Sequence, residues 1–183
     1  MAEWDDAAVV ALGSNLPGPF GSGEALLEAA CSALDQAGVN VLRRSGWWRS
    51  QAWPDPTDPP FLNGVVLAAT SLEPRACLGA LLAIERAFGR ARAERNAPRT
   101  LDLDLIALGR RVMDEAELVL PHPRAHRRRF VMGPLAEIAP AWRHPTLGRT
   151  AAELAASAVD GADAQPVTTK ASSRPPHSAQ EPS

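Results

Sequence analysis

Asp102 and Asp104 stand two residues apart in an apolar run of the chain. Successive side chains of a β-strand point to opposite faces, so both carboxylates would lie on one face. Leu101, Leu103 and Leu105 would then lie on the other face. Enzymes commonly hold magnesium with one or two carboxylates and the phosphate oxygens of a substrate. The aspartate pair therefore indicates a metal-bound polyphosphate and phosphoryl-transfer chemistry.

This interpretation of the aspartates competes with a plainer one, because alternating polar residues also occur on the solvated face of an ordinary strand. Ile106 continues the aspartate face with an apolar group, which indicates that this face is not simply exposed. Burying carboxylates without a metal ion or another partner is costly. The position of Ile106 therefore favours metal binding.

An arginine-rich segment comes directly before the aspartates and contains Arg90, Arg92, Arg95 and Arg99. Guanidinium groups pair with phosphate oxygens and can neutralise the negative charge that moves onto a leaving group. A solvated basic loop is the alternative, although Pro98 favours a more rigid one. The single lysine is Lys170, in the C-terminal tail, so no Walker-type loop is expected. Phosphate binding would fall to arginine, histidine and backbone amides.

Four further side chains are suited to binding a nucleotide or a flat heterocycle. His122 stands between two prolines with arginines close behind it, which supports phosphate contact as an alternative to a structural role. Asn63 is unusual in an apolar strand, so it could shape a bulge or recognise the edge of a ligand. Phe61 and Phe130 are either core residues or stacking partners for a heterocycle.

Composition favours one globular domain that does not coat nucleic acid. The 183 residues are 45% hydrophobic and 22% charged, and the formal net charge of −2 gives no basic excess. Cys31 and Cys77 lack the spacing of a zinc site or a disulfide framework. The acidic first residues and the lack of a long apolar run predict a cytoplasmic protein without a membrane segment.

Hydrophobic periodicity predicts the order strand, helix, strand, strand, helix, strand. This order is typical of α+β folds with a ferredoxin-like βαββαβ core, in which helices cover an antiparallel-containing sheet. The expected ranges are 7–12, 24–37, 39–48, 61–70, 71–89 and the strand with the two aspartates. Ser71 is the expected N-cap of the second helix, and 13–15 is expected to form a turn.

The remaining sequence predicts a helix at 130–139, a short one from Thr150, and then a change of character. Residues 1–159 would form the single domain. From 160 to 183 the chain is rich in Ser, Pro, Ala and Gln and has almost no large apolar residue, so this tail is expected to be disordered.

The motifs, taken in order, resemble those of the 6-hydroxymethyl-7,8-dihydropterin pyrophosphokinases, or diphosphokinases, of folate biosynthesis. The resemblance rests on ALGSN at 11–15, FLN at 61–63, IE at 84–85, GRAR at 89–92, APRTLDLDLI at 97–106, LPHPR at 120–124 and RRFVMGPL at 128–135. It extends over about 7–157, and APRTLDLDLI is its most specific element.

The resemblance implies a ferredoxin-like fold and a transfer of the β,γ-diphosphate of ATP to the pterin hydroxymethyl oxygen, with release of AMP. Two magnesium ions would be bound by Asp102 and Asp104. ATP would be bound by Glu85, Arg90, Arg92, Arg99, His122 and Arg128, of which Arg90, Arg92 and Arg99 would be catalytic. The pterin would be bound by Ser50, Trp53, Phe61, Asn63 and Phe130. The expected partners are these two small molecules, without nucleic acid or membrane, and the expected state is a monomer.

Two other classes of protein compete with this assignment. A two-metal phosphodiesterase or a nucleotide-sugar transferase could use the Asp102 and Asp104 pair as its metal motif, but it would not need Asn63 between stacking aromatics. An RNA-binding ferredoxin-like module could present aromatics on its sheet, but the sequence pattern of such modules is missing and the net charge is slightly acidic.

Overall fold

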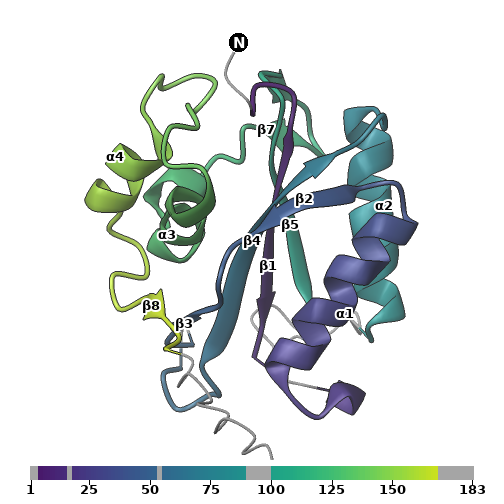
Figure 1. Cartoon of the computed structure of the whole chain (residues 1–183), viewed down its shortest axis with the longest axis vertical. Coiled ribbons are helices and arrows are strands. Elements are labelled where there is room, and N and C mark those ends of the chain that lie inside the picture. Colours follow the sequence, from purple (N-terminus) through teal and green to yellow (C-terminus); the bar gives the residue numbers. More distant parts are fainter. Residues whose placement is uncertain (1–3, 16–17, 53–54, 90–99, 169–183) are drawn as a thin grey trace, which may run out of the picture.

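The computed structural model of the chain describes residues 4–15, 18–52, 55–89 and 100–168. A six-stranded sheet runs through the middle of this part, with α1 (Gly23–Gln36) and α2 (Pro74–Ala87) on one face. The helices α3 (Arg129–Ile138) and α4 (Ala151–Ser157) lie on the other face (Figure 1). None of the helices in the described part is long and apolar enough to cross a membrane.

The sheet has the strand arrangement of a ferredoxin-like core. Its strands are β1 (Ala8–Ser14), β2 (Asn40–Arg44), β3 (Trp48–Ser50), β4 (Phe61–Ala69), β5 (Asp102–Leu108) and β8 (Gln165–Pro166). Both β2 and β3 pair with β4, then β4 pairs with β1 and β1 with β5, all antiparallel. With α1 after β1 and α2 after β4, the predicted βαββαβ order and the α+β class are confirmed.

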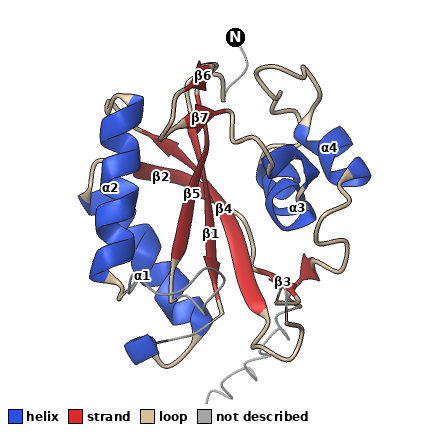
Figure 2. Cartoon of the chain, turned by 180° about the vertical axis from the view of Figure 1, so that it is seen from behind, coloured by secondary structure: helices blue, strands red, loops and turns tan. Residues whose placement is uncertain are grey.

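Shorter elements complete the described part. They are η1 (Gly18–Phe20), the paired strands β6 (Met113–Asp114) and β7 (Val119–Leu120), and η2 (Ala125–Arg127). Figure 2 shows β6 and β7 at one end of the sheet and β3 at the opposite end. The predicted helices at 130–139 and from Thr150 correspond to α3 and α4, and Thr150 caps α4 through a capping box with Glu153.

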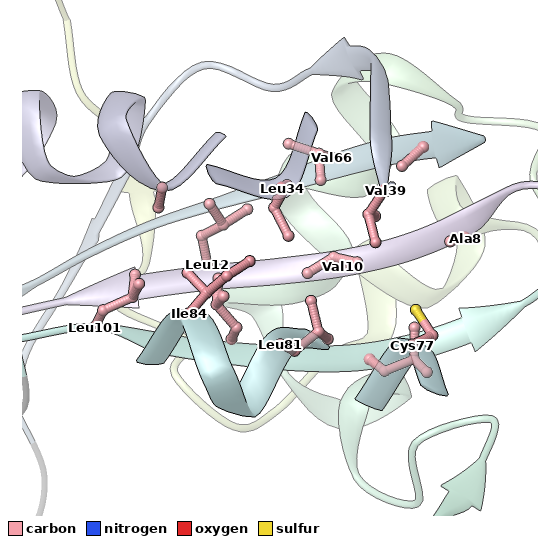
Figure 3. Close-up of a cluster of buried hydrophobic side chains, with 14 of the residues drawn as sticks. Ala8, Val10, Leu12, Leu34, Val39, Val66, Cys77, Leu81, Ile84 and Leu101 are labelled. Atoms are coloured by element: carbon pink, nitrogen blue, oxygen red, sulfur yellow. The ribbon is translucent and has the colours of Figure 1, made fainter. Parts of the chain in front are cut away.

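Two hydrophobic cores hold the layers together. The first core lies between the sheet and the α1/α2 layer, where Leu34 and Leu81 pack against Val10 and Leu12 of β1 (Figure 3). The second core lies under α3 and α4 and includes Ile106 of β5. Each fully buried aliphatic side chain contributes roughly 1.5–3 kcal/mol to folding, so these cores fix the sheet on which the polar residues stand.

A β-bulge in β5 determines how the chain leaves the aspartate strand. Val9 and Val10 of β1 pair with Ala107 and Leu105, so Ile106 is an extra residue in β5. Ile106 and Ala107 consequently both pack in the second core. The carbonyl oxygen of Ile106 accepts a hydrogen bond from the backbone N–H of His122 at 2.8 Å. The bulge therefore attaches the His122 loop to the edge of β5.

Two predicted boundaries in the first half of the chain are wrong. The N-cap of α2 is Glu73 and not Ser71, because Pro74 fixes its own φ and restricts the preceding residue to extended geometry, so the helix begins at the proline. The single strand expected at 39–48 is two strands, β2 and β3. The chain leaves the ladder at Gly46, whose backbone N–H donates to the Glu137 carboxylate on α3 at 2.7 Å.

The expectation of disorder from residue 160 onward is wrong for residues 160–168. Within this stretch β8 pairs with β3, and Ala164 is buried. Backbone hydrogen bonds hold much of the segment, and a single apolar side chain adds to them. The N–H of Val167 donates to the Trp47 carbonyl at 2.8 Å, and the Val167 side chain packs against the first core. Composition alone could not reveal that kind of attachment. Residues 169–183 lie outside the described part.

His144, which precedes α4, is a buried imidazole that must stay neutral to keep its hydrogen bonds. Its Nδ1 accepts from the backbone N–H groups of Thr146 at 3.3 Å and Leu147 at 3.2 Å. Burial lowers the pKa of His144 from an ordinary 6.5 to about 4, and the nearby His126 and Arg110 act in the same direction. Protonation of Nδ1 would break both hydrogen bonds.

Replacing His144 with Asn is expected to weaken the loss of stability in acid. As pH falls from about 6.5 to about 4, the unfolded chain takes up a proton at His144 that the folded protein does not, so folding stability decreases across this window. Asparagine supplies an acceptor oxygen but does not titrate. Calorimetry between about pH 7 and pH 4 should show a smaller fall in Tm for His144→Asn than for the wild type, and equal falls would contradict the assignment.

Candidate functional site

One row of residues crosses four strands of the sheet and carries much of the candidate site. Trp48 of β3 lies opposite Asn63 of β4. Asn63 lies opposite Gly13 of β1, and Gly13 lies opposite Asp102 of β5. Residues directly opposite one another in antiparallel strands present their side chains on the same face. The asparagine and the first aspartate therefore stand on one face with only a glycine between them.

The second aspartate shares this face, as the sequence predicted. Asp102 and Asp104 are both half-buried, whereas Leu103 and Leu105 are buried in the first core. Ile106 lies in the second core, so the aspartate face is the one that α3 covers further along β5. The strand thus holds both carboxylates close to the start of α3.

Gly13 is a strand residue and not part of the expected turn at 13–15. A Cβ atom at this position would lie 3.4 Å from Oδ1 of Asn63 and 4.0 Å from Cβ of Asp102. The missing side chain therefore keeps the space between the amide and the carboxylate open. Only Asn15 leaves the strand, because β1 extends through Ser14 to stay paired with β4.

A first pocket of about 230 Å³ opens above this row. It is lined by Ala11, Leu12, Gly13, Ser50, Gln51, Phe61, Asn63, Asp102, Asp104, Arg128, Phe130 and Val131. The amide nitrogen of Asn63 donates to the Ser50 hydroxyl at 2.9 Å, which fixes the orientation of a side chain that is only 5% exposed. The Arg128 guanidinium lies over the Phe130 ring, 5.7 Å from its centroid. Two aromatic rings, the buried amide of Asn63 and two carboxylates therefore converge on a small cavity.

A second pocket of about 300 Å³ lies at the edge of β5. It is lined by Leu78, Leu82, Glu85, Asp102, Leu103, Asp104, Leu105, Ala116, Glu117, Leu118, Val119, His122 and Pro123. Asp102 and Asp104 line both pockets, so the carboxylates stand where the two cavities adjoin. A group bound in one pocket could reach a group bound in the other across these two side chains.

Glu85 of α2 supports the strand between the two aspartates. Its side chain is buried, with 2% exposure, and its Oε1 accepts a hydrogen bond from the backbone N–H of Leu103 at 2.7 Å. Within the described residues β5 pairs with β1 on one side only, so this N–H lies on the open edge of the strand. The carboxylate thereby satisfies an edge amide and fixes the backbone that positions both aspartates.

His122 is held as a neutral imidazole beside the carboxylates. Its Nδ1 accepts from the backbone N–H of Arg124 at 3.2 Å, which leaves the proton on Nε2. Burial lowers the pKa of His122 below its ordinary 6.5, and the positive charges of Arg128 and Arg124 lower it further. Asp104 raises the pKa but does not outweigh burial. At neutral pH the imidazole therefore offers an N–H donor in the second pocket.

The structure brings most of the predicted site residues together. Seven of the predicted residues line the first pocket: Ser50, Phe61, Asn63, Asp102, Asp104, Arg128 and Phe130. Two of these, Asp102 and Asp104, also line the second pocket. Glu85 and His122 line the second pocket. The predicted residues Trp53, Arg90, Arg92 and Arg99 lie outside the described residues.

Several lining residues were not singled out from the sequence. Gly13 belongs to the ALGSN motif, and its place inside that motif was the available signal. No sequence motif marked the other lining residues Gln51, Leu78, Leu82 and Glu117. Each of them reaches a pocket only through the packing of its own segment. Their roles depend on tertiary contacts that local patterns do not encode.

Asp102 and Asp104 are suited to binding a metal ion together with a bound small molecule that supplies further oxygen atoms. Among residues 4–15, 18–52, 55–89 and 100–168, no group of three or more His, Cys, Asp or Glu side chains is placed to hold a metal. Asp102 and Asp104 supply hard oxygen donors from one face of one strand, and magnesium is typically completed by phosphate oxygens and water. The donor set therefore suits magnesium carried in with a polyphosphate.

Replacing Gly13 with Val is expected to close the first pocket while leaving the fold intact. The branched side chain would occupy the space between Asn63 and Asp102, although valine is favourable in a strand. Binding of a flat heterocycle should weaken about tenfold or more, because the added groups overlap the ligand volume. Gly13→Ala is the graded control, since its Cβ would lie at 3.4 Å from the nearest atom. Equal affinity in Gly13→Val and wild type, measured by fluorescence titration, would contradict this use of Gly13.

Comparisons with known proteins show the family to which the chain is similar. Residues 9–140 match the family model of 7,8-dihydro-6-hydroxymethylpterin-pyrophosphokinase (HPPK). The 2-amino-4-hydroxy-6-hydroxymethyldihydropteridine pyrophosphokinase of Synechocystis sp. is 47% identical over 148 residues, which cover 80% of this chain and 73% of that protein. The protein of the same name from Pseudomonas aeruginosa is 40% identical over 149 residues, covering 81% of this chain and 89% of that protein.

A solved structure supports the fold. The HPPK-DHPS of Plasmodium falciparum matches with a TM-score of 0.65 at 13% sequence identity, over 82% of this chain. The chain spans 44% of that longer protein, so the likeness bears on the architecture of one part of it. The family model covers well over half of the present sequence, and the curated relatives are similar over most of their length. This chain therefore belongs to the 7,8-dihydro-6-hydroxymethylpterin-pyrophosphokinase family.

Proposed function

We propose that this chain transfers the β,γ-diphosphate of ATP to the hydroxymethyl oxygen of 6-hydroxymethyl-7,8-dihydropterin, which yields AMP and the pterin diphosphate. Pyrophosphoryl transfer to hydroxymethyldihydropterin, a step of folate biosynthesis, is the reaction of the family. The observation that best supports the proposal is that two pockets adjoin at Asp102 and Asp104. A donor and an acceptor of phosphate could meet there.

The first pocket is proposed to bind the pterin. Phe61 and Phe130 would stack on the two faces of the flat ring, which aromatic side chains do favourably. Asn63 would pair with the edge of the ring, since a carboxamide offers both donors and an acceptor. The hydrogen bond to Ser50 would hold the amide in one orientation for this purpose. Trp53, outside the described residues, is proposed as a further contact.

The second pocket is proposed to bind ATP. Leu78 and Leu82 provide apolar walls suited to the base, while Glu85 and His122 line the same cavity near the aspartates. The Nε2–H of His122 would donate to a phosphate oxygen. Arg128, which lines the first pocket, would reach the phosphates from the pterin side. The proposed catalytic residues Arg90, Arg92 and Arg99 lie outside the described part.

Asp102 and Asp104 are proposed to hold two magnesium ions together with the ATP phosphates. When bound, magnesium would offset the negative charge of the phosphate oxygens and favour attack at the β-phosphorus. The chain's own part would be to place the two substrates in line. Glu85 fixes the backbone between the aspartates, and the Ile106 carbonyl fixes the His122 loop beside them. Positioning of this kind supplies a large share of the rate in phosphoryl transfer.

Phosphorus NMR of the purified protein with ATP, magnesium and 6-hydroxymethyl-7,8-dihydropterin would test the proposal. The expected products are AMP and a pterin diphosphate, formed only when the pterin is present. ADP or inorganic phosphate as the product would indicate another phosphotransferase or a two-metal hydrolase. Salt-dependent RNA binding without ATP turnover would instead support the RNA-binding alternative.

A further inference from the structure

The segment 159–168, called here the C-terminal segment, attaches to the strand that leads into the first pocket. In this segment β8 pairs with β3, with Gln165 opposite Arg49 and Pro166 opposite Trp48. The carboxylate of Asp163 accepts a hydrogen bond from the backbone N–H of Gln51 at 2.6 Å. Gln51 lines the first pocket directly after β3. The segment therefore holds one wall of that pocket.

The same segment attaches to the start of α3, which forms a second wall of the pocket. The backbone N–H of Arg129 donates to the Asp160 carbonyl at 2.8 Å, and that of Asp160 donates to the Arg127 carbonyl at 2.9 Å. The Arg129 side chain adds a hydrogen bond from Nε to the Ala164 carbonyl at 3.0 Å. These contacts fix the backbone around Arg128, whose side chain lines the pocket.

Gly161 brings the segment against the Phe130 ring itself. A Cβ atom at Gly161 would lie 2.5 Å from Cδ1 and 3.1 Å from Cε1 of Phe130, so no other residue fits without moving the ring. The φ of Gly161 is 68°, a left-handed value that also favours glycine. The backbone of the C-terminal segment is therefore in direct contact with one of the two aromatic side chains of the pocket.

We propose that the C-terminal segment sets the distance between the two walls of the pterin pocket, with Gly161 and Asp163 as positioning residues for Phe130 and Gln51. This inference rests on the proposed function of the first pocket. One short segment contacts both walls, although Gln51 and Phe130 lie far apart in the sequence. The segment would thus act mainly on pterin affinity, since its residues do not line the second pocket and it would influence ATP through the backbone of Arg128.

The main test compares Gly161→Ala with Gly148→Ala. Gly148 has almost the same left-handed φ, 66°, but nothing lies within 4 Å of its Cβ position. Both variants place alanine at a similar left-handed φ, and only Gly161→Ala pushes on Phe130. Relative to Gly148→Ala, Gly161→Ala should raise the KM for 6-hydroxymethyl-7,8-dihydropterin about tenfold and the KM for ATP much less, because the segment would influence ATP only through Arg128. Equal pterin KM values in the two folded variants would overturn the proposal.

A second pair of variants decides the matter if Gly161→Ala fails to fold. Asp163→Ala removes the acceptor for the Gln51 N–H, whereas Asp163→Asn keeps an oxygen in the same place. A pterin KM raised severalfold in Asp163→Ala and restored in Asp163→Asn would support the proposal, and an unchanged KM in Asp163→Ala would overturn it. Wild-type protein that forms no pterin diphosphate would refute the proposed function itself, which separates that failure from a failure of the positioning role.

Discussion

Replacement of Asp102 or Asp104 by Asn is expected to lower kcat by about a thousandfold or more, equivalent to roughly 4 kcal/mol of transition-state stabilisation. Asparagine keeps the size of the side chain but removes the charge that would hold magnesium against the ATP phosphates. Folding should change little, because both side chains are half-buried at the junction of two open pockets. Removing one of two neighbouring negative charges also relieves repulsion, so Tm should stay the same or rise slightly.

Steady-state kinetics at several magnesium concentrations, together with thermal unfolding, would check this expectation. Asp114→Asn is the matched control, because Asp114 is an exposed aspartate on β6 that lines neither pocket. It should retain wild-type kcat and Tm. A double variant of Asp102 and Asp104 that remained active and magnesium-dependent would show that other residues bind the metal. A large loss of Tm in the single variants would instead assign the aspartates a structural role.

The order of elements could be predicted because hydrophobic periodicity is a local property. The alternation around Asp102 and Asp104 placed both on one face, and β5 has that arrangement. The bulge at Ile106 was not predictable, because it depends on how β5 pairs with β1. At this bulge the Ile106 carbonyl accepts a hydrogen bond from the His122 N–H. This bond explains how the His122 loop, which follows β5 in the sequence, comes to lie beside the aspartates.

The residues of the candidate site were predicted better than the contacts that hold them. Asn63 stood out because an amide is unusual in an apolar strand, and the resemblance named Ser50, but the hydrogen bond between them emerged only from the pairing of β3 with β4. Gly13 was assigned to a turn because glycine followed by serine and asparagine is typical of one. In the folded chain Gly13 lies opposite both Asn63 and Asp102, where a side chain would fill the pocket.

The error over the C-terminal segment has a different physical origin. Predictions of disorder rest on a shortage of large apolar side chains, and the residues after 159 have almost none apart from Val167. Ordered backbone can also be held by hydrogen bonds to neighbouring main chain, as between Arg129 and Asp160, and by the close fit of Gly161 on Phe130. Neither contact leaves a hydrophobic pattern in the sequence.

Replacement of Asn63 by Leu is expected to lower kcat/KM for the pterin by about a hundredfold, because a polar ligand edge would be buried against an apolar side chain without partners. A carboxamide has two N–H donors and one acceptor oxygen, of which the Ser50 hydroxyl takes one donor. The other groups are the ones proposed to recognise the pterin. Leucine has the branching and the number of side-chain heavy atoms of asparagine and suits a buried strand position, so Tm should change little.

The control is Ser50→Ala, which releases the Asn63 amide without removing it. That variant should lose only severalfold in kcat/KM, because one neutral hydrogen bond contributes about 1 kcal/mol. The KM for ATP should stay at the wild-type value in both variants, since neither residue lines the second pocket. If Asn63→Leu raised the KM for ATP as much as the KM for the pterin, Asn63 would be acting through the shape of the whole sheet and not through ligand recognition. A selective loss of pterin affinity, graded from Ser50→Ala to Asn63→Leu, would identify the amide as a group that recognises the edge of the pterin.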